Sequence, residues 1–403
     1  MRQQRFALFK KLRKQSPSWV VKKIFLNIIL TILLILPIFT FIIIRDLERD
    51  VDSNDKEPWL RWYDDPSESI VISWETDSNT STYLEWGISA SNLSENVTIA
   101  GNVGVHHVYL NGLLPNTKYY YRVGASNTST GNTYSFMTAP ATENVPFTFL
   151  AISDTQESEL GISHHARVAA AINDEPNARF VVHGGDVADH GSIQESWNYF
   201  FKHSSRYTPN IPLVFTLGNH DNKINQPMYR KYYAFNQTNE LLYYSFNYSS
   251  LHVISLKFPY GNDGEFKPAM LSWLADDLNK SASKQFKLVV FHCPMLSSSF
   301  FGRHRRMEAE LHPLFDQYNV TLVINGHSHH YERCLLDGVT YSIVAGGGGL
   351  MDPCHNTLPE TQAIHSIPHY VRVRVDPSTG MKYEALMPDG TVFDSVLLQG
   401  GVP

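Results

Sequence analysis

Residues 146–156 read Pro-Phe-Thr-Phe-Leu-Ala-Ile-Ser-Asp-Thr-Gln, an apolar run that ends in Asp154 and Gln156. Four later stretches repeat this design, in which a polar motif directly follows a short apolar run. Their motifs contain Asp186 and Asp189, Asn219 and His220, His292, and His327 and His329. Short β-branched runs bounded by turn residues predict buried strands. All five motifs therefore fall at the carboxyl ends of strands, the edge of an α/β sheet where ligands bind.

The side chains of these motifs are carboxylates, imidazoles and amides. These groups suit two adjacent divalent cations, which in proteins neutralise charge and lower the pKa of a bridging water. The sequence therefore predicts a metal site of hydrolytic type. A single motif of this kind would be weak evidence, but five in a fixed order at strand ends are strong.

The order D-x-[HQ], G-D-x-x-D-x-G, G-N-H-D, H and G-H-x-H resembles that of the calcineurin-like metallophosphoesterase superfamily. With its β-rich first part and the ending His-Tyr-Glu-Arg at 330–333, the chain most resembles purple acid phosphatases and their relatives, over roughly residues 57–400. The resemblance implies an α/β fold. Its catalytic core is a β-sandwich flanked by helices (αββα), and an all-β, fibronectin type III-like sandwich precedes it.

The resemblance also implies a ligand set for two divalent transition-metal ions (Mn²⁺, Zn²⁺ or Fe²⁺), with Asp186 as the bridging carboxylate. The first metal would take Asp154, Gln156, Asp186 and His329. The second would take Asp186, Asn219, His292 and His327.

Two residues beside these ligands suit proton transfer. His220 follows a ligand directly, and a histidine protonated near neutral pH is a suitable general acid. Asp189 would orient its imidazole and keep it charged; the alternative is an ordinary turn residue. Arg303 and His304 lie in a polar run before a predicted helix. They either contact the substrate phosphate or form a solvated helix start.

Two positions depart from the purple phosphatase pattern. Asp189 stands where that family has a tyrosine whose phenolate binds ferric iron, so we expect no purple colour. Gln156 offers an amide oxygen, a weaker donor than imidazole, so the first metal is expected to bind loosely. The glycine run at 345–350 lacks the ending of a phosphate-binding loop. We expect it to let the backbone pass close to the metal centre.

The first 57 residues predict a membrane anchor. Residues 1–23 carry basic side chains and no acid, residues 24–44 carry no charge and have the length of a bilayer-spanning helix, and residues 45–57 form a charged stalk. A signal peptide is the rival interpretation, but the apolar run ends without a small-residue cleavage site. Basic residues before the span and acidic residues after it predict a cytoplasmic N-terminus and an extracytoplasmic catalytic domain.

Two domains are expected after the stalk. Residues 58–140 show short alternating segments typical of a β-sandwich, and Leu113–Val123 resembles the tyrosine corner of fibronectin type III modules. Residues 146–400 alternate strands with helical stretches, at 164–174, 195–207, 268–280 and 306–318. Residues 241–256 are predicted to form paired antiparallel strands, and residues 370–398 three further strands that close a sheet.

The composition of the chain bears on its binding partners, its disulfides and its glycosylation. The net charge of −6 shows no dominant basic face, so no nucleic acid is expected. Three cysteines exclude a disulfide scaffold, although Cys334 and Cys354 could form one bridge outside the cell. Sequons that a glycosylating compartment could use occur at Asn79, Asn92, Asn96, Asn127, Asn236, Asn247, Asn279 and Asn319. A chain rich in Asn, Ser and Thr also explains them.

The leading hypothesis is a membrane-anchored, extracytoplasmic phosphomonoesterase that acts on a phosphorylated small molecule or phosphoprotein. Phosphodiesterase or nucleotide pyrophosphatase activity at the same site is the first alternative. The second is a surface binding protein with a degraded metal site, for which Gln156 is the only support.

Overall fold

The computed structural model describes residues 56–401, except residues 63, 126–127, 130, 158–160, 162, 223–226, 234–242, 259–265, 301 and 355–356. The described residues belong to the compact unit Ser53–Pro403. The predicted membrane segment 24–44 lies outside them. Among the helices that are described, none has the length and apolarity needed to cross a bilayer.

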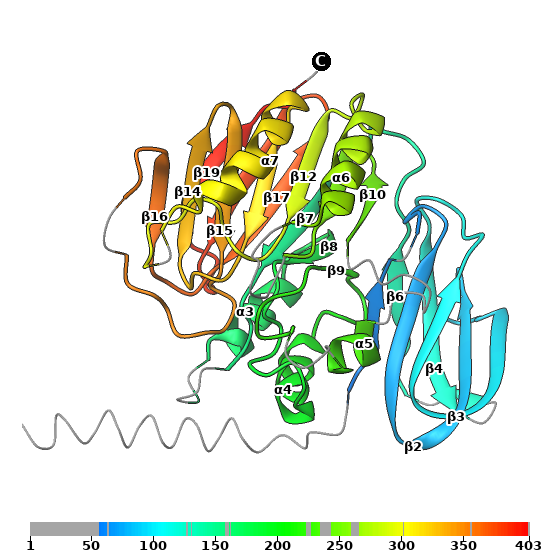
Figure 1. Ribbon diagram of the computed structural model, residues 1–403. Coiled ribbons are helices and arrows are strands. Elements are labelled where there is room, and N and C mark those ends of the chain that lie inside the picture. The colour runs from blue at the N-terminus through cyan, green and yellow to red at the C-terminus, as the bar shows by residue number, and fades with distance from the viewer. Residues whose placement is uncertain are drawn as a thin grey trace, which may run out of the picture. The chain divides into compact units, whose positions relative to one another are not determined.

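Two mixed sheets form the centre of the second part of the chain (Figure 1). In this part of the chain, the strand order of the first sheet is β19 (Val392–Leu398), β18 (Gly380–Leu386), β17 (Tyr370–Asp376), β7 (Phe147–Ile152), β8 (Ala178–His183) and β9 (Leu213–Phe215). The strand order of the second sheet is β10 (Tyr244–Tyr248), β11 (Leu251–Ser255), β12 (Phe286–Val290), β13 (Leu322–Asn325), β15 (Val339–Val344), β14 (Tyr331–Leu336) and β16 (Thr361–His365).

The alternation of side chains along β7 shows how the layers pack. Phe149 and Ala151 join one buried core with residues of the second sheet such as Val290. Leu150 and Ile152 point to the opposite face. There they pack with the apolar side chains of α3 (His165–Asn173) and α4 (Gln194–Ser204). The first sheet is therefore covered by helices on one face and by the second sheet on the other.

The second sheet is covered in the same way. Ile254, Val289 and Val323 share a core with apolar residues of α6 (Pro268–Lys280) and α7 (Arg305–Gln317), which include Leu274, Leu311 and Phe315. The order of layers is thus helix, sheet, sheet, helix, which confirms the predicted αββα core. The four predicted helices, the antiparallel pair β10–β11 and the closing strands β17 to β19 are all present.

An all-β domain precedes this core. It consists of β1 (Trp59–Arg61), β2 (Ile70–Gly87), β3 (Glu95–Leu110), β4 (Lys118–Ala125), β5 (Thr128–Ser129) and β6 (Tyr134–Met137). The first part of β2 pairs with β1 and the end of β3, while its second part pairs with β4 and the start of β3. Tyr119 accepts a hydrogen bond from the Leu114 backbone N–H at 2.9 Å, which is the geometry of a tyrosine corner.

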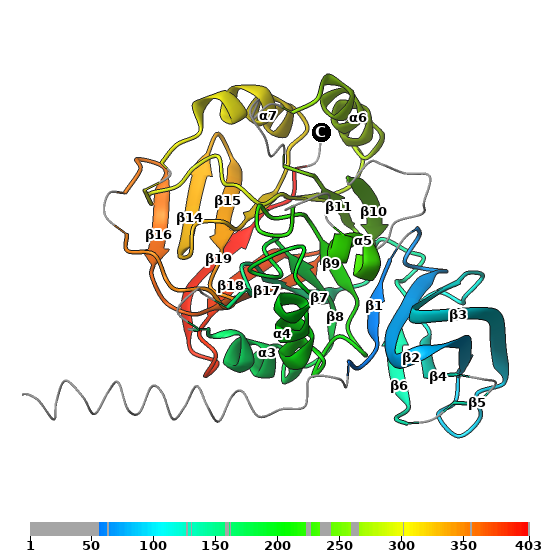
Figure 2. The same cartoon turned by 60° about the horizontal axis from the view of Figure 1, so that its bottom comes forward.

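The β domain contacts the two-sheet core through β1 and through a helix that the sequence pattern did not predict, α5 (Pro227–Tyr233). β1 lies beside β9 with Arg61 opposite Leu213, so one sheet continues across both domains (Figure 2). Lys231 of α5 binds Glu75 of β2 at 2.7 Å, and its carbonyl accepts from His107 Nε2 of β3 at 3.0 Å. The β domain therefore fixes the helix that follows the Asn219-His220-Asp221 motif.

Candidate metal centre

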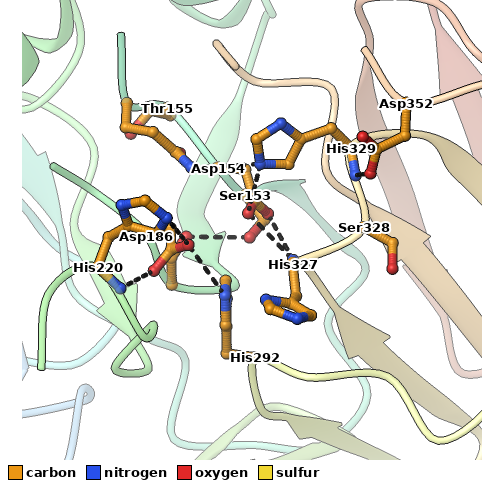
Figure 3. A network of polar contacts seen from close by, with 12 residues as sticks. Ser153, Asp154, Thr155, Asp186, His220, His292, His327, Ser328, His329 and Asp352 are labelled. Carbon is orange, nitrogen blue, oxygen red and sulfur yellow. Dashed lines mark hydrogen bonds and ion pairs between the residues drawn. The ribbon is translucent and has the colours of Figure 1, made fainter. Parts of the chain in front are cut away.

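Parallel strand pairing brings the five motifs together. β7, β8 and β9 are parallel neighbours in the first sheet, and β12 and β13 are parallel neighbours in the second. Each motif begins within four residues of the end of its strand, so all five lie at the same edge of the stacked sheets. Side chains far apart in the sequence thus meet at one centre, shown in Figure 3.

The backbone at this edge is sharply turned. Asp154, Asp186 and His327 have φ angles of 58°, 53° and 69°, in the left-handed region that non-glycine residues rarely adopt. Such conformations cost about 1–3 kcal/mol each and cluster at functional sites. Gly218 is required here, since a Cβ on it would lie 1.9 Å from Asp186 Oδ1. The unfavourable backbone conformation of these three residues directs their side chains toward the centre (Figure 3).

Asp186, His292 and His327 form the closest group of potential ligands among the described residues. One ligand atom from each lies within 4.8 Å of the others. Asn219 belongs to the same group, because its Oδ1 lies 3.1 Å from His292 Nε2 and 2.8 Å from His327 Nδ1. These are the four side chains that the resemblance assigns to the second metal, and the structure brings all of them together.

His292 is held in a ligand's orientation. Its ring is fully buried, and Nδ1 donates to the Gly184 carbonyl at 2.8 Å. Nε2 therefore faces Asp186 Oδ2 at 3.2 Å. Burial lowers the pKa of His292, but the carboxylates of Asp186 and Asp154 outweigh it and raise the pKa to about 9. The field at Nε2 thus strongly favours a positive charge.

His329, Asp154 and Gln156 form the second half of the centre. His329 Nδ1 donates to the Leu350 carbonyl at 2.9 Å, so Nε2 faces Asp154 Oδ1 at 3.4 Å. Burial lowers the pKa of His329, but Asp154 raises it to about 9. Asp154 is itself fully buried. Burial raises its pKa, yet His292 and His329 hold it below the usual range of a carboxyl.

This donor set fits a pair of cations. In both His292 and His329 a backbone carbonyl accepts a hydrogen bond from Nδ1–H, the arrangement that orients imidazole ligands in metal proteins. Their Nε2 atoms face carboxylate oxygens, which is unfavourable unless a proton or a metal ion lies between. Gln156 is 3% exposed and its Oε1 has no hydrogen-bond partner among the described residues. A cation would satisfy that buried oxygen.

His220 and Asp189 lie at the rim of the centre. The His220 backbone N–H donates to Asp186 Oδ1 at 2.8 Å, and its ring Nε2 lies 3.9 Å from Asp186 Oδ2. The other ring nitrogen, Nδ1, is 2.6 Å from the Asp189 carbonyl and 3.3 Å from the Asp189 carboxylate. The predicted pair is therefore formed, although the closer partner is the backbone of Asp189.

A buried carboxylate beside the centre, Asp221, was not predicted from the sequence. Asp221 is fully buried and accepts hydrogen bonds from the backbone N–H groups of Val187, Ala188 and Gly218. These hydrogen bonds tie the loop of Asp186 to the loop of Asn219. Burial and the nearby Asp186 raise the pKa of Asp221 to about 7. Its place in the Gly-Asn-His-Asp motif was the available signal.

The glycine run behaves as predicted. Gly349 lies against the imidazole of His329, where an added Cβ would come within 2.5 Å of the ring, and its N–H donates to the Asp154 carbonyl at 3.0 Å. The absence of a side chain at Gly349 therefore lets the backbone of this run lie directly against Asp154 and His329.

Arg303 and His304 are engaged elsewhere. The Arg303 guanidinium binds Glu308 and Glu360, and His304 Nδ1 caps α7 by accepting from the Met307 N–H at 3.2 Å. Of the two alternatives for Arg303 and His304, contact with the substrate phosphate or a role at the start of a helix, these contacts favour the second. The bridge considered between Cys334 and Cys354 is not formed, since both are free thiols.

Comparison with known proteins agrees with this geometry. Residues 147–331 match the family model of the calcineurin-like phosphoesterases, and residues 57–138 match that of the purple acid phosphatase N-terminal domain. A purple acid phosphatase of Glycine max is 28% identical over 314 residues, which cover 70% of this chain and 63% of that protein. A phosphoenolpyruvate phosphatase of Allium cepa is 25% identical over 313 residues, which cover 69% and 63%.

Among solved structures, the purple acid phosphatase PPD1 of yellow lupin seeds superposes with a TM-score of 0.68 at 16% identity, over 84% of this chain and 73% of that one. This likeness concerns the fold. The chain spans less than two-thirds of the length of the two curated relatives. The two family matches and the fold nevertheless agree, and the chain carries a calcineurin-like metallophosphoesterase domain preceded by a purple acid phosphatase N-terminal domain.

Proposed function

We propose that the protein is a metal-dependent phosphoester hydrolase of the acid phosphatase type, which cleaves phosphomonoesters. The observation that carries this proposal is the convergence of Asp186, His292 and His327 within 4.8 Å, with Asp154, Gln156 and His329 beside them. Two bound divalent ions would neutralise the phosphoryl group and lower the pKa of the attacking water.

The residues of the chain have separate tasks in this proposal. Asp186 uses one oxygen to accept from the His220 N–H and turns the other toward His292. It therefore links the metal-binding group to the proton donor. His220 is held at Nδ1 by Asp189, so the proton that it gives to the leaving oxygen is the one on Nε2.

The substrate is proposed to be a phosphorylated small molecule or phosphoprotein outside the cytoplasm. Support comes from the basic residues 1–23, the uncharged residues 24–44 and the acidic stalk that follows. The sequon asparagines Asn79, Asn92, Asn96, Asn247, Asn279 and Asn319 are exposed, as modification would require. Detergent-dependent extraction, protection of the N-terminus from external protease and a mobility shift with glycosidase would test the location.

The activity is tested with the purified full chain in detergent. Metal content is measured by plasma mass spectrometry, and turnover is measured on a nitrophenyl phosphate monoester and the matching diester. About two equivalents of transition metal and faster monoester cleavage are expected. Faster diester cleavage would point to a phosphodiesterase instead. A protein that binds no metal and cleaves neither ester would be a binding protein, and the proposal would be wrong.

A further inference from the structure

The loop between β12 and α7 has an inverted polarity. Ser297 and Ser298 are 1% and 5% exposed, whereas Phe300 is 96% exposed. Surface loops normally turn hydroxyl groups to water and large apolar side chains inward. Here the serines point into the protein and the aromatic ring points out. A single exposed apolar residue is ordinary on a protein surface. A loop that exposes its phenylalanine and buries its serines is unusual and suggests a role for the exposed ring.

A buried carboxylate holds the loop in place. Glu332 of β14 is fully buried and accepts from Ser298 twice, from the backbone N–H at 2.7 Å and from Oγ at 2.5 Å. Thr361 also donates to Glu332, at 2.7 Å. Hydrogen bonds to an ionised carboxylate are among the stronger ones. The fold therefore holds the loop at Ser298, two residues before Phe300.

The loop is anchored next to the metal centre. Ser328 lies between His327 and His329 in the chain (Figure 3), and its Oγ is 3.0 Å from Ser299 Oγ and 3.3 Å from Ser297 Oγ. A turn closed by the Gly302 N–H and the Ser299 carbonyl at 3.1 Å contains Phe300. Phe300 thus directly follows Ser299, whose side chain contacts the segment that carries the candidate ligands His327 and His329.

A second exposed apolar residue approaches the same segment from the glycine run. Leu350 is 47% exposed, and its carbonyl accepts from His329 Nδ1 at 2.9 Å. Two loops that contact residues 327–329 therefore each expose a large apolar side chain, and that segment carries two imidazoles of the candidate centre. A phosphoester that reaches this centre with its phosphoryl group has an organic leaving group to place at the rim.

We propose that Phe300, assisted by Leu350, contacts the leaving group of the substrate, so that the site favours phosphoesters with an aromatic or extended apolar leaving group over small alkyl phosphates. This inference rests on the proposed phosphoesterase function and specifies its substrate class. Aromatic contacts of this kind contribute to substrate binding and to the transition state alike, so they act mainly on KM.

The test compares phenyl phosphate with methyl phosphate in the wild type and in Phe300→Ala. We expect Phe300→Ala to lower kcat/KM for phenyl phosphate about 3- to 10-fold, chiefly through KM, and to leave methyl phosphate unchanged. Phe300→Tyr should restore the phenyl phosphate value. Ile88→Ala, at a β-domain residue that is 65% exposed, is the matched control and should change neither substrate.

Binding provides a readout without turnover. Calorimetry of the manganese-loaded protein with phenylphosphonate and methylphosphonate should show the same selective loss in Phe300→Ala. Equal effects on the two ligands, or none, would overturn the role of Phe300 while leaving phosphoesterase activity standing. A wild type that binds phenylphosphonate no better than methylphosphonate would also overturn it. Absence of turnover with a preserved binding preference would instead refute the proposed function.

Discussion

The imidazole Nδ1 of His220 lies 2.6 Å from the backbone carbonyl oxygen of Asp189 and 3.3 Å from its carboxylate. Both neighbours accept hydrogen bonds, so Nδ1 carries a proton in either charge state of the ring. Nε2 is then the nitrogen that exchanges a proton at the site. Because the nearer acceptor belongs to the backbone, most of this orientation does not depend on the Asp189 side chain.

His220→Asn is expected to lower turnover of alkyl phosphates by about 10²–10⁴-fold, the usual contribution of a general acid. Nitrophenyl phosphate should suffer less, because nitrophenolate leaves without a proton. Asp189→Asn should show the same pattern more weakly, since the carbonyl remains. Rates on both esters and metal content provide the measurement. Loss of metal from His220→Asn, or equal losses on both esters, would contradict the general-acid role.

Asp186→Asn is expected to remove activity and metal together. Asp186 Oδ2 lies 3.2 Å from His292, and both oxygens are committed within the centre. An amide removes the charge that two cations share, so metal content by mass spectrometry and turnover should fall in parallel. Asp389→Asn, in an exposed turn, is the control. Full metal content with normal rates in Asp186→Asn would show that another group bridges the ions.

Gln156→Ala is expected to reduce bound metal from two equivalents toward one. The buried Oε1 of Gln156 lacks a hydrogen-bond partner among the described residues and lies beside His329, so its removal affects the first ion selectively. Titration with Mn²⁺ should show one weakened and one unchanged step. The exposed Gln362→Ala serves as control. Two unchanged steps in Gln156→Ala would mean that Gln156 is a packing residue.

Iron-loaded protein is expected to show no charge-transfer band in the visible spectrum. The resemblance to the purple enzymes places Asp189 where that family has a phenolate. Tyr331, which lies near the ligand segment in sequence, donates its hydroxyl to Asp394 at 2.5 Å. An absorption spectrum after anaerobic loading with iron and oxidation provides the check. A band in the middle of the visible range would show that a tyrosine reaches the metal after all.

Mild acid is expected to weaken the β domain's hold on α5 through His107. Burial and Arg61 lower the pKa of His107 to about 4, and its Nδ1 lies 2.8 Å from Ser73 Oγ while Nε2 contacts the Lys231 carbonyl. The unfolded chain takes up the proton near its ordinary pKa of about 6.5, so stability falls as pH drops from about 6.5 to 4.

His107→Gln should remove part of that loss, at most about 3 kcal/mol. The measurement is urea unfolding of metal-free protein at about pH 7 and about pH 4.5, compared between wild type and variant. An identical pH dependence in the two proteins would mean that His107 does not titrate across this range.

The core of the fold and the meeting of the five motifs at one sheet edge could be predicted because they depend on local pattern. Apolar runs of strand length before Asp154, Asp186, Asn219, His292 and His327 place those residues at strand ends, and parallel pairing does the rest. The helix α5 was not predicted, although Tyr229, Tyr232 and Tyr233 stand at helical spacing and are buried. Seven residues are too few for that spacing to be distinctive, and the helix is held by contacts from Glu75 and His107. Asp221 was missed for a related reason: its role consists of three backbone hydrogen bonds.

The sequence by itself determined the αββα core, the strands that precede the five motifs and the carboxylate, imidazole and amide chemistry that follows them. Only the tertiary structure decided the partners. It turned Arg303 toward Glu308 and Glu360, gave the Asp189 backbone the nearer contact to His220, and exposed Phe300 on a loop tied to Glu332. Periodicity and motif spacing are properties of neighbouring residues, whereas hydrogen bonds and exposure depend on side chains brought together by folding from distant parts of the chain.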